Sequence, residues 1–244
     1  MRGLDIVQPV PPRPVSRIAV AGRPLGGMTV LVVEDSRFAS EAVRLLCLRS
    51  GARIRRADSL RAALRHLQSY RPDAAIIDMG LPDGNGAELI RLISQNVPRI
   101  PAIIGISGDS SNQELALDAG ADAFLPKPVE SLAVFQNAVL SALPPDQRPR
   151  GLRLLEREDV VLPDQGALRD DLAHVAEMLD SRNPDALDYI ARFLAGVARS
   201  AHDRPLEDAA SALAQLTRQG NVAADDVTRL GAMVQVRLAG VSQH

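Results

Sequence analysis

Over residues 28–143, short apolar runs rich in β-branched residues alternate with segments of helical periodicity. The predicted strands are residues 29–33, 53–54, 74–77, 103–106 and 124–125, and the predicted helices are residues 38–48, 60–67, 87–93, 114–118 and 131–140. Continuous apolar strands that alternate with helices are typical of a parallel sheet covered on both faces and connected by right-handed crossovers. The pattern therefore predicts an α/β domain with a five-stranded, doubly wound parallel sheet.

The rest of the chain divides into three segments of different composition. Residues 1–27 hold five prolines and are predicted to be a flexible tail, and residues 143–165 are predicted to be a polar linker with further prolines. Residues 166–244 show helical patterns that are interrupted at prolines and at Gly220, namely at 166–180, 185–202, 205–218 and 223–239. Because short connections make neighbouring helices antiparallel, this region is predicted to be an all-α helical bundle.

Composition disfavours several classes of protein. Residues 151–244 carry 10 basic and 15 acidic side chains, whereas a DNA-binding domain normally presents a basic face to the phosphates. Aromatic residues make up 2% of the chain, which also disfavours base stacking, so nucleic acid is not an expected partner. Cys47 is the only cysteine, which excludes an internal disulfide framework. No apolar run approaches the roughly 18 residues of a membrane-spanning helix, so we expect a cytoplasmic protein.

Polar side chains follow four of the five predicted strands. Glu34 and Asp35 come after the first strand, Asp78 after the third, Ser107 ends the fourth, and Lys127 follows the fifth. The carboxyl ends of parallel strands meet at one edge of the sheet, where ligands bind. Clustered carboxylates repel one another unless a cation neutralises them, and an all-oxygen cluster suits Mg²⁺. The alternative interpretation is that these acidic residues cap the helices that follow them.

Lys127 is the only lysine in a chain with 28 lysines and arginines. An ammonium group acts as a compact point charge on a carboxylate or phosphoryl oxygen, whereas the planar guanidinium group needs more room. A lone lysine at a strand end therefore indicates a crowded anionic site, the alternative being a surface lysine retained by accident.

Four segments together resemble the receiver domain of two-component response regulators: VVEDS at 32–36, DMGLPDGNG at 78–86, ISG at 106–108 and AGADAFLPKP at 119–128. The resemblance covers about residues 28–142 and implies a flavodoxin-like receiver fold. It also implies that Asp78 is the phosphoacceptor and that Glu34, Asp35 and Asp78 hold Mg²⁺ together with the backbone carbonyl of Gly80. No further cofactor is implied.

The same resemblance assigns three further roles. Ser107 is the switch hydroxyl, Lys127 pairs with the phosphoryl group, and Phe124 is an aromatic side chain that turns inward after phosphorylation. For Phe124 the alternative is simple core packing. A carboxylate can attack the phosphorus of a phosphohistidine to form an acyl phosphate, with catalysis supplied by positioning and charge neutralisation.

The chain departs from the family pattern in one spacing. Ser107 and Lys127 are 20 positions apart, about two fewer than is usual in the family, and the missing residues must come from the fourth helix. Receivers commonly dimerise through the face that contains this helix. We therefore expect the C-terminal bundle to be the dimerisation domain, with an apolar surface on residues 187–197 left over for a partner.

One helix of the bundle weakly resembles a histidine phosphotransfer domain. In ARFLAG at 191–196, Arg192 stands where the phosphorylated histidine would be and Ala195 where a lysine would be. We expect Asp188, Arg192, Ala195 and Arg199 to share the face opposite the apolar stripe, with Arg192 exposed and paired with Asp188. An ordinary amphipathic helix explains the pattern equally well. His174 and His202 are expected to be solvated surface residues.

These observations predict a response regulator that accepts a phosphoryl group on Asp78 from a histidine kinase or a histidine phosphotransfer protein. It would signal through protein contacts of the bundle and form a homodimer. We expect no enzymatic activity beyond self-catalysed phosphorylation and dephosphorylation. The alternatives are a DNA-binding transcriptional regulator and a phosphorelay intermediate that uses His174 or His202.

Overall fold

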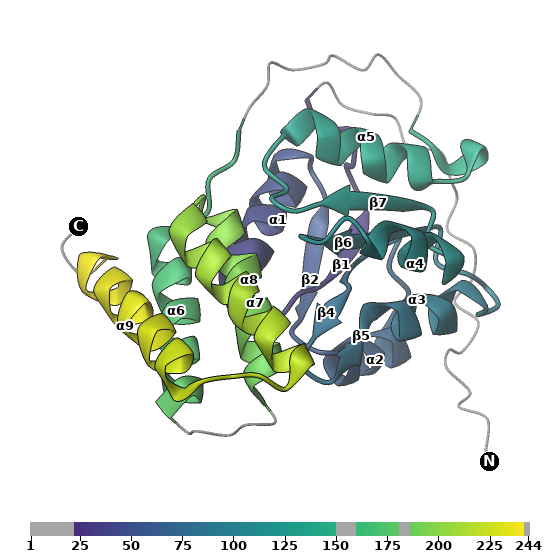
Figure 1. The fold of residues 1–244 in the computed structure, drawn as a ribbon. Coiled ribbons are helices and arrows are strands. Elements are labelled where there is room, and N and C mark those ends of the chain that lie inside the picture. Colours follow the sequence, from purple (N-terminus) through teal and green to yellow (C-terminus); the bar gives the residue numbers. More distant parts are fainter. Residues whose placement is uncertain (1–21, 150–159, 181–185, 242–244) are drawn as a thin grey trace. The chain divides into compact units, whose positions relative to one another are not determined.

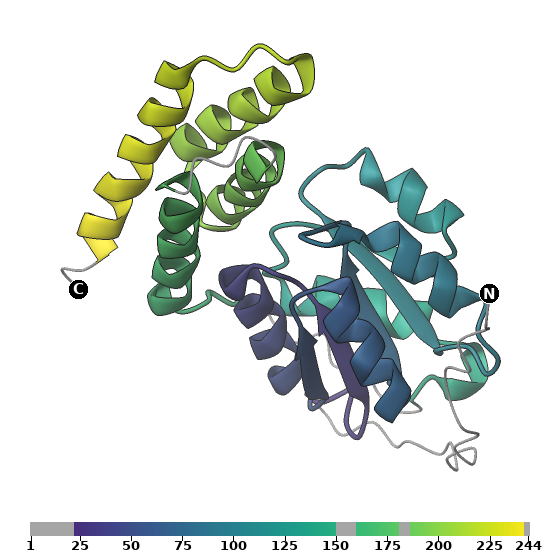
Figure 2. The same ribbon diagram turned by 90° about the horizontal axis from the view of Figure 1, so that it is seen from below.

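The computed structural model describes residues 22–149, 160–180 and 186–241, and these fall into two compact units. The first unit runs to Asp35 and continues from Ala42 to Leu162, whereas the second combines Ser36–Glu41 with the chain from Pro163 onward. Figures 1 and 2 show the chain from two directions. The sheet lies in the first unit, and the regular structure described in the second unit is helical.

The first unit contains a parallel sheet of five strands in the order β2-β1-β3-β6-β7 (Figure 1). The strands are β1 (Thr29–Val33), β2 (Arg53–Ala57), β3 (Ala74–Asp78), β6 (Ala102–Ser107) and β7 (Ala123–Pro126). The chain moves outward from β1 to β2 and then returns across β1 to β3, so the winding direction reverses between β1 and β3. This order confirms the predicted doubly wound sheet and places its switch point beside the ends of β1 and β3.

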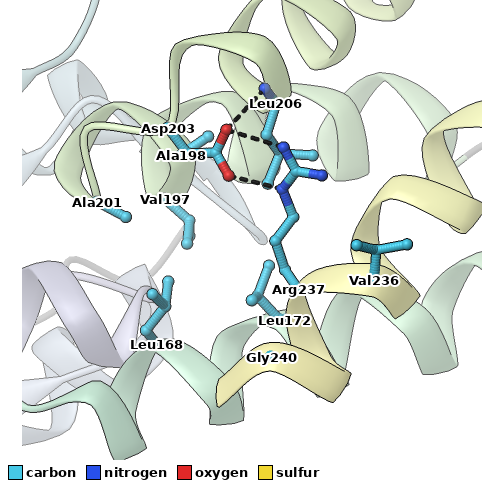
Figure 3. A pocket seen from close by; sticks show the side chains of 10 residues that line it. All are labelled: Leu168, Leu172, Val197, Ala198, Ala201, Asp203, Leu206, Val236, Arg237 and Gly240. Atoms are coloured by element: carbon cyan, nitrogen blue, oxygen red, sulfur yellow. Dashed lines mark hydrogen bonds and ion pairs between the residues drawn. The ribbon is translucent and has the colours of Figure 1, made fainter.

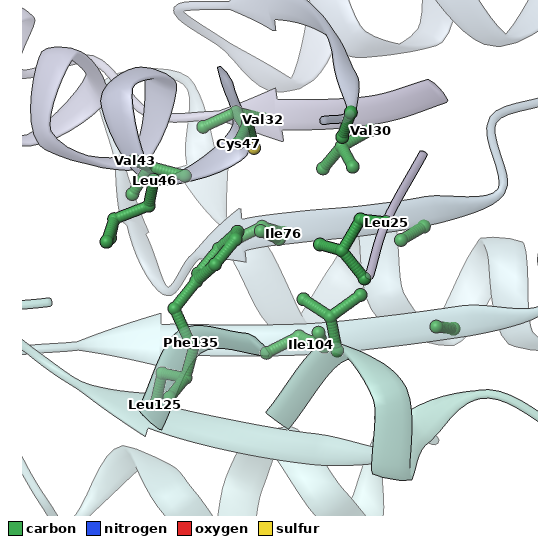
Figure 4. Close-up of a cluster of buried hydrophobic side chains, with 14 of the residues drawn as sticks. Leu25, Val30, Val32, Val43, Leu46, Cys47, Ile76, Ile104, Leu125 and Phe135 are labelled. Atoms are coloured by element: carbon green, nitrogen blue, oxygen red, sulfur yellow. The ribbon is translucent and has the colours of Figure 1, made fainter. Parts of the chain in front are cut away.

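Five helices cover the two faces of the sheet, namely α1 (Arg37–Arg49), α2 (Leu60–Ser69), α3 (Gly86–Ser94), α4 (Asn112–Asp118) and α5 (Leu132–Ala142). Successive residues of a strand point to opposite faces. Accordingly, Val30 and Val32 pack in one buried cluster with α1 and α5, and Leu31 and Val33 pack in another with α2, α3 and α4. Figure 4 shows the first cluster around Phe135 of α5, which is fully buried.

The described part of the predicted tail, residues 22–27, contributes to this core. Leu25 is fully buried in the same cluster as Phe135 (Figure 4), and its amide donates to the carbonyl of Ser50 over 2.9 Å. The packed structure therefore begins before Met28, where the sequence pattern placed its start. The reason is that a single leucine between proline and glycine has no periodicity that would reveal burial. Residues 1–21 lie outside the described residues.

The end of the predicted linker also packs on the first unit. Val161 is 1% exposed, and its amide donates to the carbonyl of Glu130 over 3.0 Å. A β-bridge joins its neighbour Val160 to Ser131. A short 3₁₀ turn, Pro145–Gln147, follows α5, and residues 150–159 of the linker lie outside the described residues.

A two-stranded hairpin that the sequence pattern did not predict follows β3. It consists of β4 (Gly80–Leu81) and β5 (Gly84–Asn85) and leads directly into α3. A Cβ atom on Gly86 would lie 2.0 Å from the carbonyl oxygen of Asp78, so only glycine lets the chain return this close to the strand end. Asn85 then caps α3 by accepting the amide of Ala87 over 2.8 Å. The hairpin thus holds the end of β3 in place.

From Pro163 onward, the described residues of the second unit form four helices, α6 (Gln165–Asp180), α7 (Leu187–Ser200), α8 (Arg204–Gln219) and α9 (Ala224–Val241), which Figure 2 draws in green to yellow. All four contribute to one buried apolar cluster, so the predicted helical bundle is confirmed. Asp203 caps α8 through the amide of Leu206, and Gly220 ends α8 with φ 71°, a left-handed conformation that favours glycine.

The second unit also buries one carboxylate. Asp171 of α6 is 3% exposed and accepts hydrogen bonds from the Ser36 hydroxyl and from the amides of Arg37 and Phe38, over 2.8, 2.9 and 3.0 Å. Burial raises the pKa of Asp171, while these donors act in the opposite direction. Three donors on one carboxylate explain how a charged side chain is tolerated there.

Candidate functional site

Five side chains converge at the carboxyl ends of the strands of the first unit. Asp78 is the last residue of β3, Ser107 the last residue of β6, and Lys127 follows β7 directly. Glu34 and Asp35 follow β1, the neighbour of β3 in the sheet. The register places all of these residues at one edge, as the sequence predicts, because every strand in the sheet is parallel.

Lys127 joins two of the carboxylates. Its Nζ lies 2.7 Å from Oε2 of Glu34 and 3.0 Å from Oδ2 of Asp78. The Lys127 side chain is 9% exposed, so both ion pairs are largely shielded from water. Carboxylate oxygens of Glu34, Asp35 and Asp78 lie within 4.8 Å of one another. We call Glu34, Asp35, Asp78 and Lys127 the strand-end cluster.

Burial and charge shift the pKa values in this cluster in a consistent way. Burial raises the pKa of Glu34 well above its usual range, and the negative charge of Asp78 adds to the effect while Lys127 opposes it. Burial alone would lower the pKa of Lys127, but attraction from Asp78 and Glu34 outweighs burial and raises it. Lys127 is therefore a permanent cation at the site.

The donor set fits a divalent cation. Three carboxyl groups beside one ammonium offer several oxygen ligands, and oxygen ligands with one partly exposed member suit a hard cation that keeps some of its water. Asp35 is the half-buried member, whereas Glu34 and Asp78 are 3% and 7% exposed. Gly80 is exposed two residues beyond Asp78, and a Cβ atom there would meet no atom within 4 Å, so the approach to Asp78 is open on that side.

Ser107 makes two contacts that the sequence did not reveal. Its hydroxyl accepts a hydrogen bond from the amide of Asp109 over 3.1 Å and from the side-chain amide of Asn112 over 3.0 Å. Asn112 is the first residue of α4 and is half-buried. No motif singled out Asn112, because its contact with Ser107 depends on how the loop between β6 and α4 folds.

Phe124 lies on β7 beside Gly105 of β6 and is half-buried against the cluster beneath α2, α3 and α4. A Cβ atom on Gly105 would lie 2.8 Å from Ala116 and 3.4 Å from the Phe124 ring, so this glycine makes room where α4 and Phe124 meet. This packing is compatible with both interpretations of Phe124. The fourth helix itself has seven residues, in keeping with the short spacing from Ser107 to Lys127.

The middle of α7 presents a different arrangement. Arg192 is 55% exposed and pairs with Asp188 over 2.8 Å, as the helical spacing predicts. Ala195, however, is 8% exposed, so its predicted place on the solvent face is wrong. Ala195 lies one turn after Ala191, which is fully buried, and shares its side of the helix.

The expected leftover apolar surface on α7 is also corrected. Ile190 and Leu194 are fully buried, Val197 is 1% exposed and Phe193 is 9% exposed, all within the cluster that the four helices share. The helices α6, α8 and α9 together cover the broad apolar face of α7. The sequence-based expectation was wrong because it assumed that only one narrow stripe of α7 packs against other helices. Among the described residues of the bundle, Val236 is the one large hydrophobic residue that is exposed.

The two histidines of the bundle lie at its surface. His174 is exposed, and its ring meets that of Phe193 edge to face, with the ring centroids 6.2 Å apart. His202 is exposed in the turn between α7 and α8, with φ 56°. Neither residue is placed in the strand-end cluster.

The bundle also contains a hollow of about 500 Å³, drawn in Figure 3. Its lining is mostly apolar and comes from α6, α7, α8, α9 and the turn between α7 and α8. The apolar and small lining residues are Leu168, Leu172, Val197, Ala198, Ala201, Leu206, Val236 and Gly240. An ion pair between Asp203 and Arg237 forms one side, with nitrogen–oxygen distances of 2.6 and 3.0 Å. A third nitrogen of Arg237 donates to the carbonyl of Met233, so the guanidinium group is held within the bundle.

Comparison with known proteins agrees with the geometry of the first unit. Residues 30–138 match the family model of the response regulator receiver domain. The KDP operon transcriptional regulatory protein KdpE of Escherichia coli is 39% identical over 101 residues, which cover 41% of this chain and 44% of KdpE. The response regulator MprA of Mycolicibacterium vanbaalenii is 35% identical over 120 residues, which cover 48% of this chain and 52% of MprA. The chain thus spans about half the length of the curated relatives it matches.

Two solved structures are similar as well. The receiver domain of the sensor histidine kinase PA1611 from Pseudomonas aeruginosa, solved with a magnesium ion in its active-site cleft, is 26% identical with a TM-score of 0.43; the match covers 48% of this chain and 98% of that domain. A receiver domain of a histidine kinase from Syntrophus aciditrophicus is 28% identical with a TM-score of 0.44, covering 53% of this chain and 99% of that domain. Within the described residues, no helix is long and apolar enough to cross a bilayer.

Proposed function

We propose that residues 30–138, which match the family model of the response regulator receiver domain, act as such a domain and that Asp78 accepts a phosphoryl group from a phosphohistidine of a partner protein. The observation that carries this proposal is the position of Lys127, whose ammonium lies between Glu34 and Asp78 at 2.7 and 3.0 Å. A shielded cation beside a carboxylate at a strand end is suited to binding a transferred phosphoryl group.

The chemistry follows from the charges. A carboxylate oxygen of Asp78 attacks the phosphorus, a P–O bond forms, and the P–N bond to the donor imidazole breaks with its electron pair returning to the ring. Lys127 stabilises negative charge on the phosphoryl oxygens. Glu34 and Asp35, with Asp78 and the Gly80 carbonyl, would hold Mg²⁺, which supplies further charge neutralisation when bound. Ser107 would then donate to a phosphoryl oxygen, and Phe124 would respond by turning inward.

The proposed output is a protein contact made by the helical bundle, with a homodimer formed through the same region. The acidic balance of residues 151–244 supports a protein partner. The protein would have no enzymatic turnover beyond self-catalysed phosphorylation and dephosphorylation. Because the apolar face of α7 is buried within the bundle, it does not support a dimer. The proposed homodimer is supported by the short α4, which alters the face through which receiver domains commonly dimerise.

A second candidate function is transcriptional regulation. The relative KdpE is a transcriptional regulatory protein, so the expectation that nucleic acid is no partner receives no support from the relatives. Titration of the full chain with duplex DNA separates the two functions, because DNA binding that weakens steeply with salt favours the transcriptional one. The third candidate, a phosphorelay intermediate, requires a phosphorylated His174 or His202.

The test of the main proposal is phosphorylation of the full chain by acetyl phosphate with Mg²⁺, followed by intact-mass spectrometry. We expect the mass of one phosphoryl group to be added and to be removed by hydroxylamine, which cleaves acyl phosphates. Asp78→Asn should abolish the gain. Asp118→Asn, a matched change at an exposed position on α4, should leave it unchanged. Labelling that survives in Asp78→Asn would overturn the assignment.

A further inference from the structure

The hydroxyl of Ser107 has a hydrogen-bond environment that restricts what it can do. Its oxygen accepts from the Asp109 amide over 3.1 Å and from Nδ2 of Asn112 over 3.0 Å. Ser107 is 7% exposed, so water has little access to compete for these positions. Both donors come from the segment that begins α4, one from the backbone and one from a side chain.

A serine hydroxyl has one proton to donate and two lone pairs that accept. When two N–H groups occupy both lone pairs, the hydroxyl is left with its donor capacity alone. Rotation of the O–H bond is also restricted, because any other orientation would displace one of the two donors. The two contacts therefore preset Ser107 as a hydrogen-bond donor.

The neighbouring strand supplies the acceptor. In the register of β3 with β6, Asp78 stands opposite Ile106, so Ser107 is one residue further along the same edge. Asp78 is 7% exposed and lies in the strand-end cluster. A phosphoryl group on Asp78 brings three acceptor oxygens to this edge.

We propose that Asn112 is a positioning residue, which presets the Ser107 hydroxyl as a donor to the phosphoryl group on Asp78 and links that bond to the first turn of α4. The inference rests on the proposed function of Asp78. The amide of Asn112 suits this role because it is an uncharged donor. A carboxylate at this position would instead accept a hydrogen bond from the Ser107 hydroxyl, which would then no longer donate to the phosphoryl group.

The experiment compares Asn112→Asp and Asn112→Ala with the wild-type chain. Both are measured for the rate of phosphorylation by acetyl phosphate with Mg²⁺ and for the lifetime of the phosphoryl group. We expect Asn112→Asp to lower the rate or the lifetime by about tenfold, the effect of losing one oriented hydrogen bond, and Asn112→Ala to lower it less. Gln113→Ala, which removes an exposed amide from the next position, is the matched control and should behave as wild type.

A double-mutant cycle with Ser107→Ala tests whether Asn112 acts through Ser107. In the Ser107→Ala background, Asn112→Asp should have no further effect on rate or lifetime. An equal effect in both backgrounds would show that the change acts through charge or structure and would overturn the inference. Wild-type behaviour of Asn112→Asp would also overturn it. Failure of the wild-type chain to be labelled at Asp78 would instead count against the proposed function itself.

Discussion

The strand-end cluster and the middle of α7 each contain residues at positions where phosphotransfer chemistry is expected, but they differ in what surrounds those residues. At the strand ends, four separate strands deliver carboxylates, a hydroxyl and an ammonium to one edge. On α7, the arginine at the corresponding position pairs with an aspartate one turn earlier on the same helix. Convergence of separate elements supports a site more strongly than a short motif on one helix.

The largest expected contrast between the two regions is in phosphorylation. Asp78→Asn should remove all acyl phosphate, whereas a variant with both His174→Asn and His202→Asn should retain it in full, because neither histidine lies in the strand-end cluster. Intact-mass spectrometry after treatment with acetyl phosphate makes the comparison. A loss of label in the histidine variant would place phosphotransfer in the bundle.

Two glycines sharpen the comparison through stability. Gly86→Ala should destabilise the chain by about 3 kcal/mol or more, because its Cβ would lie 2.0 Å from the Asp78 carbonyl oxygen and neither backbone can give way. A Cβ atom on Gly196 of α7 would meet no atom within 4 Å. Gly196→Ala should therefore stabilise the chain by about 0.5–1 kcal/mol, because alanine loses less conformational freedom in a helix than glycine. Urea denaturation followed by circular dichroism measures both. An unchanged midpoint for Gly86→Ala would contradict the geometry of the hairpin.

Lys127→Arg tests the shape of the strand-end cluster at constant charge. We expect the rate of phosphorylation at Asp78 to fall about tenfold or more, because the guanidinium group cannot occupy the place of an ammonium held between Glu34 and Asp78. Arg192→Lys on α7, where the Arg192 side chain is 55% exposed, is the matched reverse change and should have no effect on the rate. Wild-type kinetics for Lys127→Arg would show that charge alone is needed.

The smallest expected effect concerns the ion pair of Asp203 and Arg237 in the bundle. Hydrogen bonds from Arg237 lower the pKa of Asp203, although burial opposes them. A lowered pKa in the folded state means that the stabilisation is present above the unfolded value of about 3.9 and is lost as the pH falls through the lower folded value. Asp203→Asn keeps an oxygen that can accept the capping hydrogen bond of α8 but loses the charge. It should lower the free energy of unfolding by about 1 kcal/mol at pH 7.

This cost should shrink as the pH falls below about 4, which urea denaturation at several pH values can follow. Asp188→Asn is the control, because the Arg192 side chain in its ion pair is 55% exposed and such pairs contribute little. A constant difference between Asp203→Asn and wild type across this pH range would show that the ion pair is not responsible.

Much of the first unit could be predicted because its signals are local. Alternation of apolar strands and helices places β1, β3 and β6 within one residue of their observed ends, and parallel pairing then brings Glu34, Asp78, Ser107 and Lys127 to one edge. The hairpin of β4 and β5 was missed because strands of two residues carry no periodicity.

What the sequence determined by itself is the order of the elements and the edge at which the polar residues meet, since both follow from backbone periodicity and the direction of parallel strands. Only the tertiary structure decided which side chains contact one another. Leu25 in the core, Asn112 on the Ser107 hydroxyl and Asp203 with Arg237, 34 residues apart, depend on the path of loops and the rotation of helices. Those are set by packing of the whole unit, which no local pattern encodes.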